Sequence, residues 1–179
     1  MTAPPSQRPP AVAEIPVLRV AIIAGTSDPA WPAVVALRER VFGREQGIAE
    51  ATAADPDDAG SLHAVAWLEM PGPNRHDARL VGTGRITLHR ADRDEALIAW
   101  VATAPELRQR GIGTAVMAAL LAEADAAGIG ETRLAAQRHA EGFYGRLGFF
   151  AAGAPYAVNG IPHRWMTRQR GAGTLSRTV

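Results

Sequence analysis

The stretch VATAPELRQRGIGT, residues 101–114, decides the fold of this 179-residue chain. Its first residues end an apolar run that is typical of a strand, and a proline stops that run at position 105. Gly111 and Gly113 then open a segment in which Ile112 begins the apolar face of a helix. The stretch therefore predicts a strand that leads through a glycine loop into the N-terminus of a helix.

A loop of this kind is a binding site for anions. The N–H groups in the first turn of a helix lack intrahelical partners, and the helix dipole favours negative charge. Glycine lets a phosphate come close to the backbone, and Arg108 and Arg110 can add charged hydrogen bonds. The loop therefore predicts a phosphate-binding site made of Arg108, Gln109, Arg110, Gly111, Ile112, Gly113 and Thr114.

Two common nucleotide-binding patterns do not fit this loop. A Rossmann fingerprint needs a third glycine at the position of Val116, and Glu131 matches the ribose-binding acid by position only. A P-loop needs a lysine, and all 19 basic side chains of this chain are arginine. Taken alone, the Gly-x-Gly pattern also fits a glycine turn that only starts a core helix.

The rest of the chain predicts an α+β fold with mixed α/β layers. The order is strand, helix, antiparallel strands, and then strand, helix, strand, helix and strands, with a tight hairpin turn at Asn159-Gly160. We expect a flexible proline-rich leader at 1–16, one domain at 17–169 and a flexible tail at 170–179. The predicted strands are 17–23, 62–70, 80–89, 96–103 and 132–137, and the predicted helices are 31–42, 112 to about 128, and 140–147.

The composition excludes several classes of protein. Hydrophobic residues make up 47% of the chain and charged residues 21%, as in ordinary globular domains. A net charge of +1 with scattered arginines argues against a nucleic-acid partner. The absence of cysteine excludes disulfides, thiolate metal sites and a cysteine nucleophile, and we predict no bound metal. No apolar run is long enough to span a bilayer, so we expect no membrane association and a cytoplasmic location.

The pattern Arg108-x-x-Gly111-x-Gly113 resembles the GNAT superfamily of N-acetyltransferases, in which a Q/R-x-x-G-x-G/A loop cradles the pyrophosphate of coenzyme A. Further segments are similar to that superfamily and to its ElaA-like branch. They are Gln137-x-x-Ala140-x-x-Phe143-Tyr144-x-x-Leu147-Gly148-Phe149, Leu37-Arg38-x-x-Val41-Phe42-x-x-Glu45-Gln46-Gly47-Ile48, Asp57-Asp58, Ser61-x-His63, Val81-Gly82-Thr83-Gly84-Arg85-Ile86 and Gly160-Ile161-Pro162-His163. In the first of these segments, glutamine replaces the commoner asparagine and the spacer is one residue shorter than in some members.

The resemblance implies a central mixed sheet flanked by helices, and acetyl-CoA as the acyl donor. It implies that the strand Val101-Ala102-Thr103 binds the pantetheine arm and offers an N–H to the thioester oxygen, and that Gln137 contacts the coenzyme. Tyr144 matches a tyrosine that protonates the departing thiolate in many such enzymes. The alternative for Tyr144 is a core aromatic role beside Phe143.

The acceptor side is less specified by the sequence. Glu45 could receive the proton of the amine, or it could be an ordinary solvated carboxylate. His63 and His163 could act as a base or bind substrate, or they could be structural histidines. The acidic residues Glu50, Asp55, Asp57 and Asp58 could attract a cationic acceptor.

The predicted function is direct transfer of an acetyl group from acetyl-CoA to a primary amine in a ternary complex. No covalent enzyme intermediate is expected, because cysteine is missing and nothing resembles a nucleophile elbow. The alternatives are a non-catalytic acyl-CoA-binding regulatory module and an acyltransferase similar to acyl-homoserine-lactone synthases. The acceptor can be a small amine, an amino sugar, an antibiotic, a peptide N-terminus or a lysine, and the sequence indicates no oligomeric state.

Overall fold

The computed structural model describes residues 15–48, 55–69, 78–89 and 94–171. Its strands form one sheet in the order β1-β2-β3-β4-β5-β8-β6, with β7 also paired to β8. All neighbours in this sheet are antiparallel except β4 and β5, which are parallel. The strands are β1 (Val17–Ala24), β2 (Leu62–Glu69), β3 (Arg79–His89), β4 (Glu95–Thr103), β5 (Glu131–Gln137), β6 (Phe150–Ala151), β7 (Tyr156–Val158) and β8 (Ile161–Gln169).

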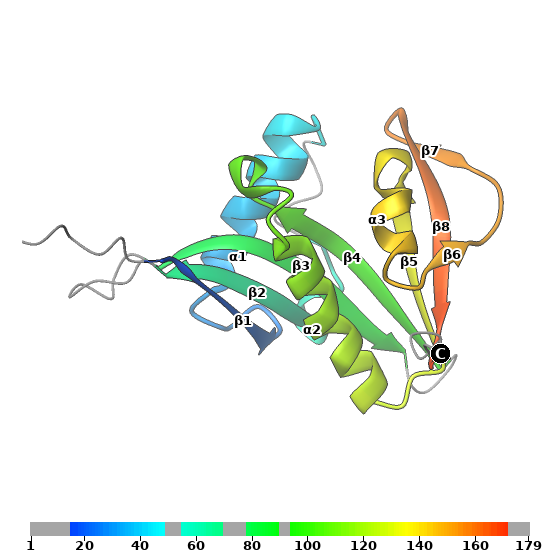
Figure 1. Cartoon of the computed structure of the whole chain (residues 1–179), viewed down its shortest axis with the longest axis horizontal. Coiled ribbons are helices and arrows are strands. Elements are labelled where there is room, and N and C mark those ends of the chain that lie inside the picture. The colour runs from blue at the N-terminus through cyan, green and yellow to red at the C-terminus, as the bar shows by residue number, and fades with distance from the viewer. Residues whose placement is uncertain (1–14, 49–54, 70–77, 90–93, 172–179) are drawn as a thin grey trace, which may run out of the picture.

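Helices cover both faces of the sheet (Figure 1). The long helix α2 (Ile112–Ala126) and the short helix α3 (Glu141–Gly145) lie on one face, and α1 (Trp31–Arg38) lies on the other. Helix α1 continues directly into a π-helical segment, η1 (Glu39–Glu45). Three short 3₁₀ turns complete the described elements: η2 (Asp58–Gly60), η3 (Pro105–Leu107) and η4 (Arg138–Ala140). The predicted α+β fold with a mixed sheet and flanking helices is confirmed.

Two glycines of β3 bring α2 unusually close to the sheet. A Cβ atom added at Gly82 would lie 2.6 Å from Cγ2 of Ile112, and one added at Gly84 would lie 2.9 Å from Cδ1 of Leu120. Real Cβ atoms do not approach other atoms this closely, so the side chains of α2 occupy the space that a larger residue would need. Gly82 therefore lets the first turn of α2, where the glycine loop ends, pack closely on β3, and Gly84 does the same further along the helix.

We expect Gly82→Ala to destabilise the protein by about 1–3 kcal/mol, because the added methyl group overpacks the contact with Ile112 and Val116. Urea unfolding followed by circular dichroism measures this loss. Gly145→Ala is the matched control, because nothing lies within 4 Å of a Cβ added at Gly145 and its φ is not positive. A Gly82→Ala protein as stable as the Gly145→Ala protein would contradict this packing argument.

A β-bulge in β4 opens the sheet. Thr83 and Arg85 of β3 pair with Ala102 and Ala99 of β4, so Trp100 and Val101 together oppose one residue of β3. Trp100 adopts a φ of 54°, which is costly for a bulky residue. Pairing between β4 and β5 ends at Ile98 and Leu134, immediately before the bulge. The two strands then separate into a V that is visible in Figure 1.

The predicted elements agree with the structure within a few residues, with two differences. The predicted helix 31–42 continues to Glu45 as a π-helical segment, in which the neighbouring residues Val41 and Phe42 are both buried. The predicted helix 140–147 consists only of α3 preceded by a 3₁₀ turn. The leader lies outside the described residues except for Ile15 and Pro16, as does the tail except for Arg170 and Gly171. Within the described part of the chain, no helix is long and apolar enough to cross a membrane.

Candidate functional site

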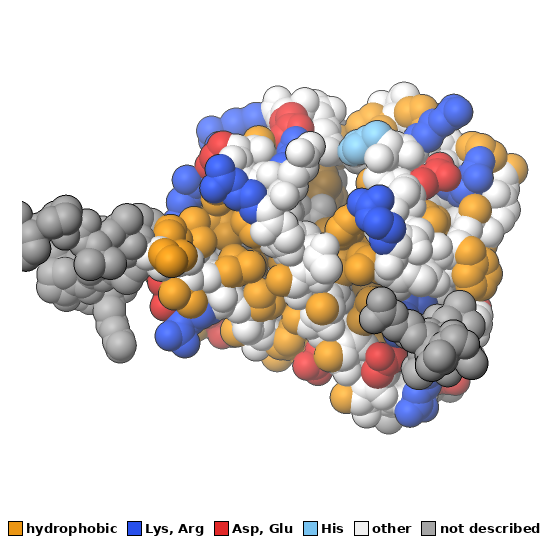
Figure 2. Space-filling model, in the orientation of Figure 1, with side chains coloured by type: hydrophobic (Ala, Val, Ile, Leu, Met, Phe, Trp, Pro, Cys, Tyr) orange, Lys and Arg blue, Asp and Glu red, His pale blue; other side chains and the backbone are white. Residues whose placement is uncertain are grey.

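A cleft of ≈ 1220 Å³ occupies the opening between β4 and β5. Figure 2 shows it as a hollow between the part of the surface formed by β4 and α2 and the part formed by α3 and β5. The cleft is lined by thirteen of the predicted site residues, which come from six different helices and strands and from the glycine loop. They are Glu45, Val101, Ala102, Thr103, Arg108, Gln109, Gly111, Ile112, Gly113, Thr114, Gln137, Tyr144 and His163.

The glycine loop, residues 108–114, presents unpaired backbone donors to this cleft. Gln109 and Gly111 adopt left-handed conformations, with φ values of 63° and 80°. The N–H groups of Ile112, Gly113 and Thr114 have no hydrogen-bond partner among the described residues, because the bonds of α2 begin with Ala115 donating to Gly111. These donors sit at the N-terminus of a 15-residue helix, where the dipole favours a bound anion.

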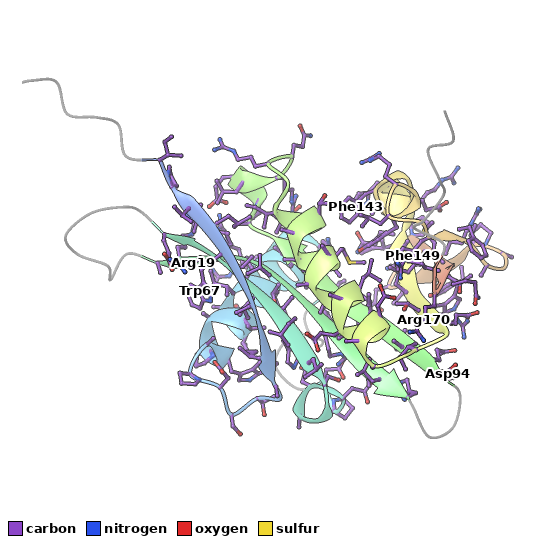
Figure 3. All side chains as sticks on the ribbon, turned by 60° about the horizontal axis from the view of Figure 1, so that its bottom comes forward. Arg19, Trp67, Asp94, Phe143, Phe149 and Arg170 are labelled. Carbon is purple, nitrogen blue, oxygen red and sulfur yellow. The ribbon has the colours of Figure 1, made fainter. Side chains whose placement is uncertain are left out.

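Gly113 leaves little free space in the direction of α3. A Cβ atom added at Gly113 would lie 3.4 Å from the ring of Phe143 and 3.6 Å from the hydroxyl of Thr103. Phe143 lies between the start of α2 and the rest of α3 (Figure 3). The end of the glycine loop, β4 and α3 therefore meet at one point of the cleft.

Arg108 is held across the cleft by Glu45, which is the last residue of η1. The two terminal nitrogens of the guanidinium group each donate to one carboxylate oxygen at 2.7 Å, in a bidentate geometry. The hydrogen bonds from Arg108 lower the pKa of Glu45, and the same contact raises the pKa of Arg108. Glu45 is thus ionised and occupied in this structure. Arg110, in contrast, is exposed and lines a separate shallow groove beside β1.

Tyr144 lines the cleft from α3. Its ring packs edge-on against Phe143 at 5.0 Å and against Phe149 at 6.1 Å. Burial raises the pKa of the phenol to about 12, so the hydroxyl keeps its proton throughout the neutral range. No hydrogen-bond partner of this hydroxyl is found in the part of the chain that the structure describes. Both roles considered from the sequence, an aromatic packing residue and a proton donor, are compatible with this position.

The other predicted side chains of the cleft are joined by hydrogen bonds. The amide of Gln137, at the end of β5, donates to the side-chain oxygen of Gln46 at 2.8 Å. This bond spans the cleft from β5 to the end of η1. His163 faces the cleft from β8, and its Nδ1–H donates to the carbonyl of Ile161 at 2.8 Å. With Nδ1 protonated, Nε2 of a neutral His163 is left as a hydrogen-bond acceptor.

His63, for which the sequence allowed either a substrate-binding or a structural role, is not among the residues that line the cleft. It is fully buried, with 0% exposure, under α1. Its Nε2–H donates to the carbonyl of Asp58 at 3.0 Å, and its Nδ1 accepts a hydrogen bond from Arg38 at 3.2 Å. His63 therefore has a structural position, and we assign it no contact with substrate. The reason is its strand register, because His63 pairs with Arg85 on the sheet face that α1 covers.

The acidic residues Asp55, Asp57 and Asp58 form ion pairs with arginines inside the protein. Asp58 binds Arg38 at 2.9 Å, while Asp55 and Asp57 lie 2.6 and 3.5 Å from Arg85. Asp55 accepts a further hydrogen bond of 2.7 Å from the indole of Trp100. These carboxylates neutralise two buried guanidinium groups and anchor the bulge residue. They are not among the residues that line the cleft, and Glu50 lies outside the described residues.

The pKa of His63 makes a prediction about stability. Burial lowers the pKa of this imidazole below its ordinary value of 6.5. Below about pH 6.5 the unfolded chain then binds a proton that the folded chain does not, so the free energy of unfolding falls as the pH decreases. We expect His63→Gln to be less stable at about pH 7.5 but to lose less stability between about pH 7.5 and 5.5 than the wild type.

Urea unfolding at both pH values measures the slope for each protein, which is the change in its free energy of unfolding with pH. His139→Gln is the control, because His139 is exposed. We expect its slope to equal that of the wild type. A His63→Gln protein with the wild-type slope would show that protonation of His63 does not contribute to acid destabilisation.

Several cleft residues were not predicted as site residues from the sequence. Leu97 and Trp100 of β4 and Trp165 of β8 line the cleft and belong to no motif. Ile161 of β8 also lines it, and it belongs to the Gly160-Ile161-Pro162-His163 segment without having been given a role. Trp100 sits in an unbroken apolar run, so no change in periodicity indicates its bulge. Concerning metals, the described residues contain no group of three histidine, aspartate or glutamate side chains that could hold an ion.

Comparisons with known proteins found related sequences and similar folds. Residues 74–170 match the family model described as the acetyltransferase (GNAT) domain. A protein of Bacillus subtilis, named provisionally as an acetyltransferase, is 29% identical over 138 residues, which cover 74% of this chain and 85% of that protein. An acyl-CoA N-acyltransferase structure from Pseudomonas aeruginosa is 26% identical, with a TM-score of 0.72, and the match covers 85% of this chain and 99% of that one. Escherichia coli ElaA is 25% identical, with a TM-score of 0.72, over 86% of this chain and all of that one.

Proposed function

The chain belongs to the GNAT acetyltransferase family, and we propose that it moves an acetyl group from acetyl-CoA to a primary amine. Members of this family use acetyl-CoA as the acyl donor. We propose that the transfer is direct and occurs in a ternary complex. The observation that carries this proposal is the cleft itself. It joins a helix N-terminus with free N–H groups, an opened strand edge and a protonated phenol within one continuous space.

We propose that the glycine loop binds the pyrophosphate of the coenzyme. The free N–H groups of Ile112, Gly113 and Thr114 would donate to the phosphate oxygens, and Arg108 would add its charge. Arg110 lies at the outer edge of this loop and would contact the coenzyme only from outside the cleft. The backbone of Val101, Ala102 and Thr103, which is past the end of the pairing with β5, would bind the pantetheine arm, and Gln137 would contact it from β5.

The reaction can be written with these groups. The lone pair of the amine nitrogen attacks the thioester carbonyl, the C–N bond forms, and the C–S bond breaks with its electron pair on sulfur. A backbone N–H of the opened part of β4 would stabilise the oxyanion. Tyr144 would supply the proton to the thiolate, and the amine would lose one proton to a base.

His163 is a better placed proton acceptor than Glu45. The hydrogen bonds from Arg108 occupy the carboxylate of Glu45 and lower its pKa, which weakens it as a base. His163 lines the cleft, and its Nε2 atom is left as an acceptor when Nδ1 donates to Ile161. We therefore propose that His163 binds the amine and accepts its proton, and that Glu45 positions Arg108.

Release of free coenzyme A from acetyl-CoA, screened over a panel of primary amines, tests the proposed function. We expect thiol release that depends on both the amine and the protein. Binding of acetyl-CoA without thiol release on any amine would instead favour a non-catalytic acyl-CoA-binding module.

A further inference from the structure

The two ends of the cleft have different chemistry. The glycine loop and Tyr144 lie at the end next to α2 and α3, which share one face of the sheet. The other end opens on the face that carries α1 and η1, and we call it the acceptor end. Strand register places Leu97 and Trp165 on that face. Leu97 pairs with Arg133 of β5 and Trp165 pairs with Ala135, and these two residues of β5 point to the same face because they are two positions apart. The acceptor end is lined by Phe42, Leu97, Trp100, Ile161, His163 and Trp165.

Aromatic rings make up much of this end, and their orientations are fixed. Phe42 packs edge-on against Trp100, with 5.1 Å between ring centroids and an interplanar angle of 77°. The indole of Trp100 is tied to Asp55 by its N–H, so the ring cannot rotate freely. Rings held in this way offer a preformed apolar surface, which binds an apolar group without ordering the side chains first.

The rings of the acceptor end already have cationic partners. The guanidinium of Arg38 lies 5.5 Å from the centroid of Trp100, and that of Arg133 lies 5.0 Å from the centroid of Trp165. A cation over an aromatic face uses the negative potential of that face. A second cation brought by a ligand would therefore find these two rings less favourable than free ones.

The charges of the cleft also disfavour a polycation. Among the described residues that line the cleft, Glu45 is the only carboxylate, and Arg108 holds it in a bidentate ion pair. Two arginines, Arg108 and Arg146, line the same space. An ammonium group buried here without a carboxylate partner would lose its hydration uncompensated.

We propose that the acceptor is a monoamine whose amino group is carried by an aromatic or bulky apolar group, and that polycationic amines are poor acceptors. This proposal rests on the proposed acetyl transfer and specifies its substrate class. The amino group would meet the Nε2 atom of His163, while the apolar group would pack against Phe42, Trp100 and Trp165.

Two amine pairs test the proposal. Hexylamine and hexane-1,6-diamine have the same chain length and differ in one terminal ammonium group, and 2-phenylethylamine adds an aromatic ring. We expect kcat/KM for hexylamine and 2-phenylethylamine to exceed that for the diamine by at least about tenfold. Equal or better use of the diamine would overturn the proposal, although the chain would then still be an acetyltransferase.

Binding provides a readout that does not depend on turnover. Two tryptophans line the acceptor end, so tryptophan fluorescence in the presence of coenzyme A should report amine binding there. We expect 2-phenylethylamine to bind at least about tenfold more tightly than hexane-1,6-diamine. If no amine is acetylated, the proposed function fails, whereas this ranking still decides which class of amine the acceptor end binds.

A charge introduced at the acceptor end gives the opposite test. Ile161→Glu should raise the affinity for the diamine relative to hexylamine by at least about fivefold, because the new carboxylate can pair with the distal ammonium. Ile161→Gln is the matched uncharged control and should not change this ratio. A diamine preference that is unaffected by Ile161→Glu in a folded protein would contradict the placement of the acceptor.

Discussion

Replacing Gly113 by glutamate is expected to abolish acetyl-CoA binding. Gly113 lies in the first turn of α2, and its own N–H is one of the free donors facing the cleft. A glutamate side chain would place a carboxylate where the pyrophosphate is expected. Juxtaposed like charges cost several kcal/mol, so we expect a loss of affinity of at least about a hundredfold, measured by calorimetric titration.

Two controls separate charge from size at Gly113. Gly113→Gln has nearly the same volume without the charge, and Gly113→Ala adds only a Cβ atom that would lie 3.4 Å from Phe143. We expect Gln to weaken binding less than Glu, and Ala to weaken it least. Wild-type affinity in a folded Gly113→Glu protein would remove the glycine loop from the coenzyme site.

Removing the hydroxyl of Tyr144 is expected to lower kcat by at least about tenfold while acetyl-CoA affinity stays near normal. The phenol has a pKa of about 12 and is therefore protonated at neutral pH, so it can donate as charge develops on the departing sulfur. Tyr144→Phe keeps the ring that packs against Phe143 and Phe149. The fold should therefore remain intact. Steady-state kinetics, with calorimetry for the coenzyme, measure both quantities.

The second tyrosine of the chain provides the matched control for this substitution. Tyr156 lies in β7 and does not line the cleft, although its ring stacks on His163 with 6.1 Å between centroids. Tyr156→Phe keeps this stacked ring and removes only the hydroxyl, so it is the same chemical change without loss of a group that lines the cleft. We expect turnover within about twofold of the wild type. If Tyr144→Phe turns over as fast as Tyr156→Phe, another group or solvent protonates the thiolate, and Tyr144 is a packing residue.

The local part of the site could be predicted from the sequence. The glycine loop depends on a strand, two glycines and a helix start within 14 consecutive residues, so its pattern is complete in one segment. The structure describes the same segment as η3, a loop with two left-handed residues, and the first turn of α2. Elements of this kind follow from local periodicity and turn residues.

The contacts across the cleft could not be predicted in this way. Glu45 and Arg108 are 63 residues apart, and Gln46 and Gln137 are 91 residues apart. Their pairing depends on where β4 separates from β5. The bulge at Trp100 controls that separation, and it lies in a run in which every residue from Ala96 to Ala102 is apolar. Such a run has no alternation whose interruption could be recognised.

The motif around His63 identified the residue as one that belongs to a family pattern, but it did not predict whether its role is structural or functional. Its surroundings resembled a family pattern, and a histidine in such a pattern can bind substrate. The burial of two guanidinium groups under α1 requires partners, and His63 supplies one of them together with Asp58. The sequence shows the polar residues of this network but not the face of the sheet on which they meet.

The most direct test of the proposed acetyl transfer is product stoichiometry with acetyl-CoA labelled with ¹³C in the acetyl group. After incubation with the protein and 2-phenylethylamine, mass spectrometry should detect the labelled N-acetyl amine in amounts equal to the free coenzyme A released. The Gly113→Glu protein should produce neither. Acetyl-CoA that binds the wild-type protein but yields no labelled amide with 2-phenylethylamine, hexylamine or the wider panel of primary amines would contradict the assignment of this cleft to acyl transfer.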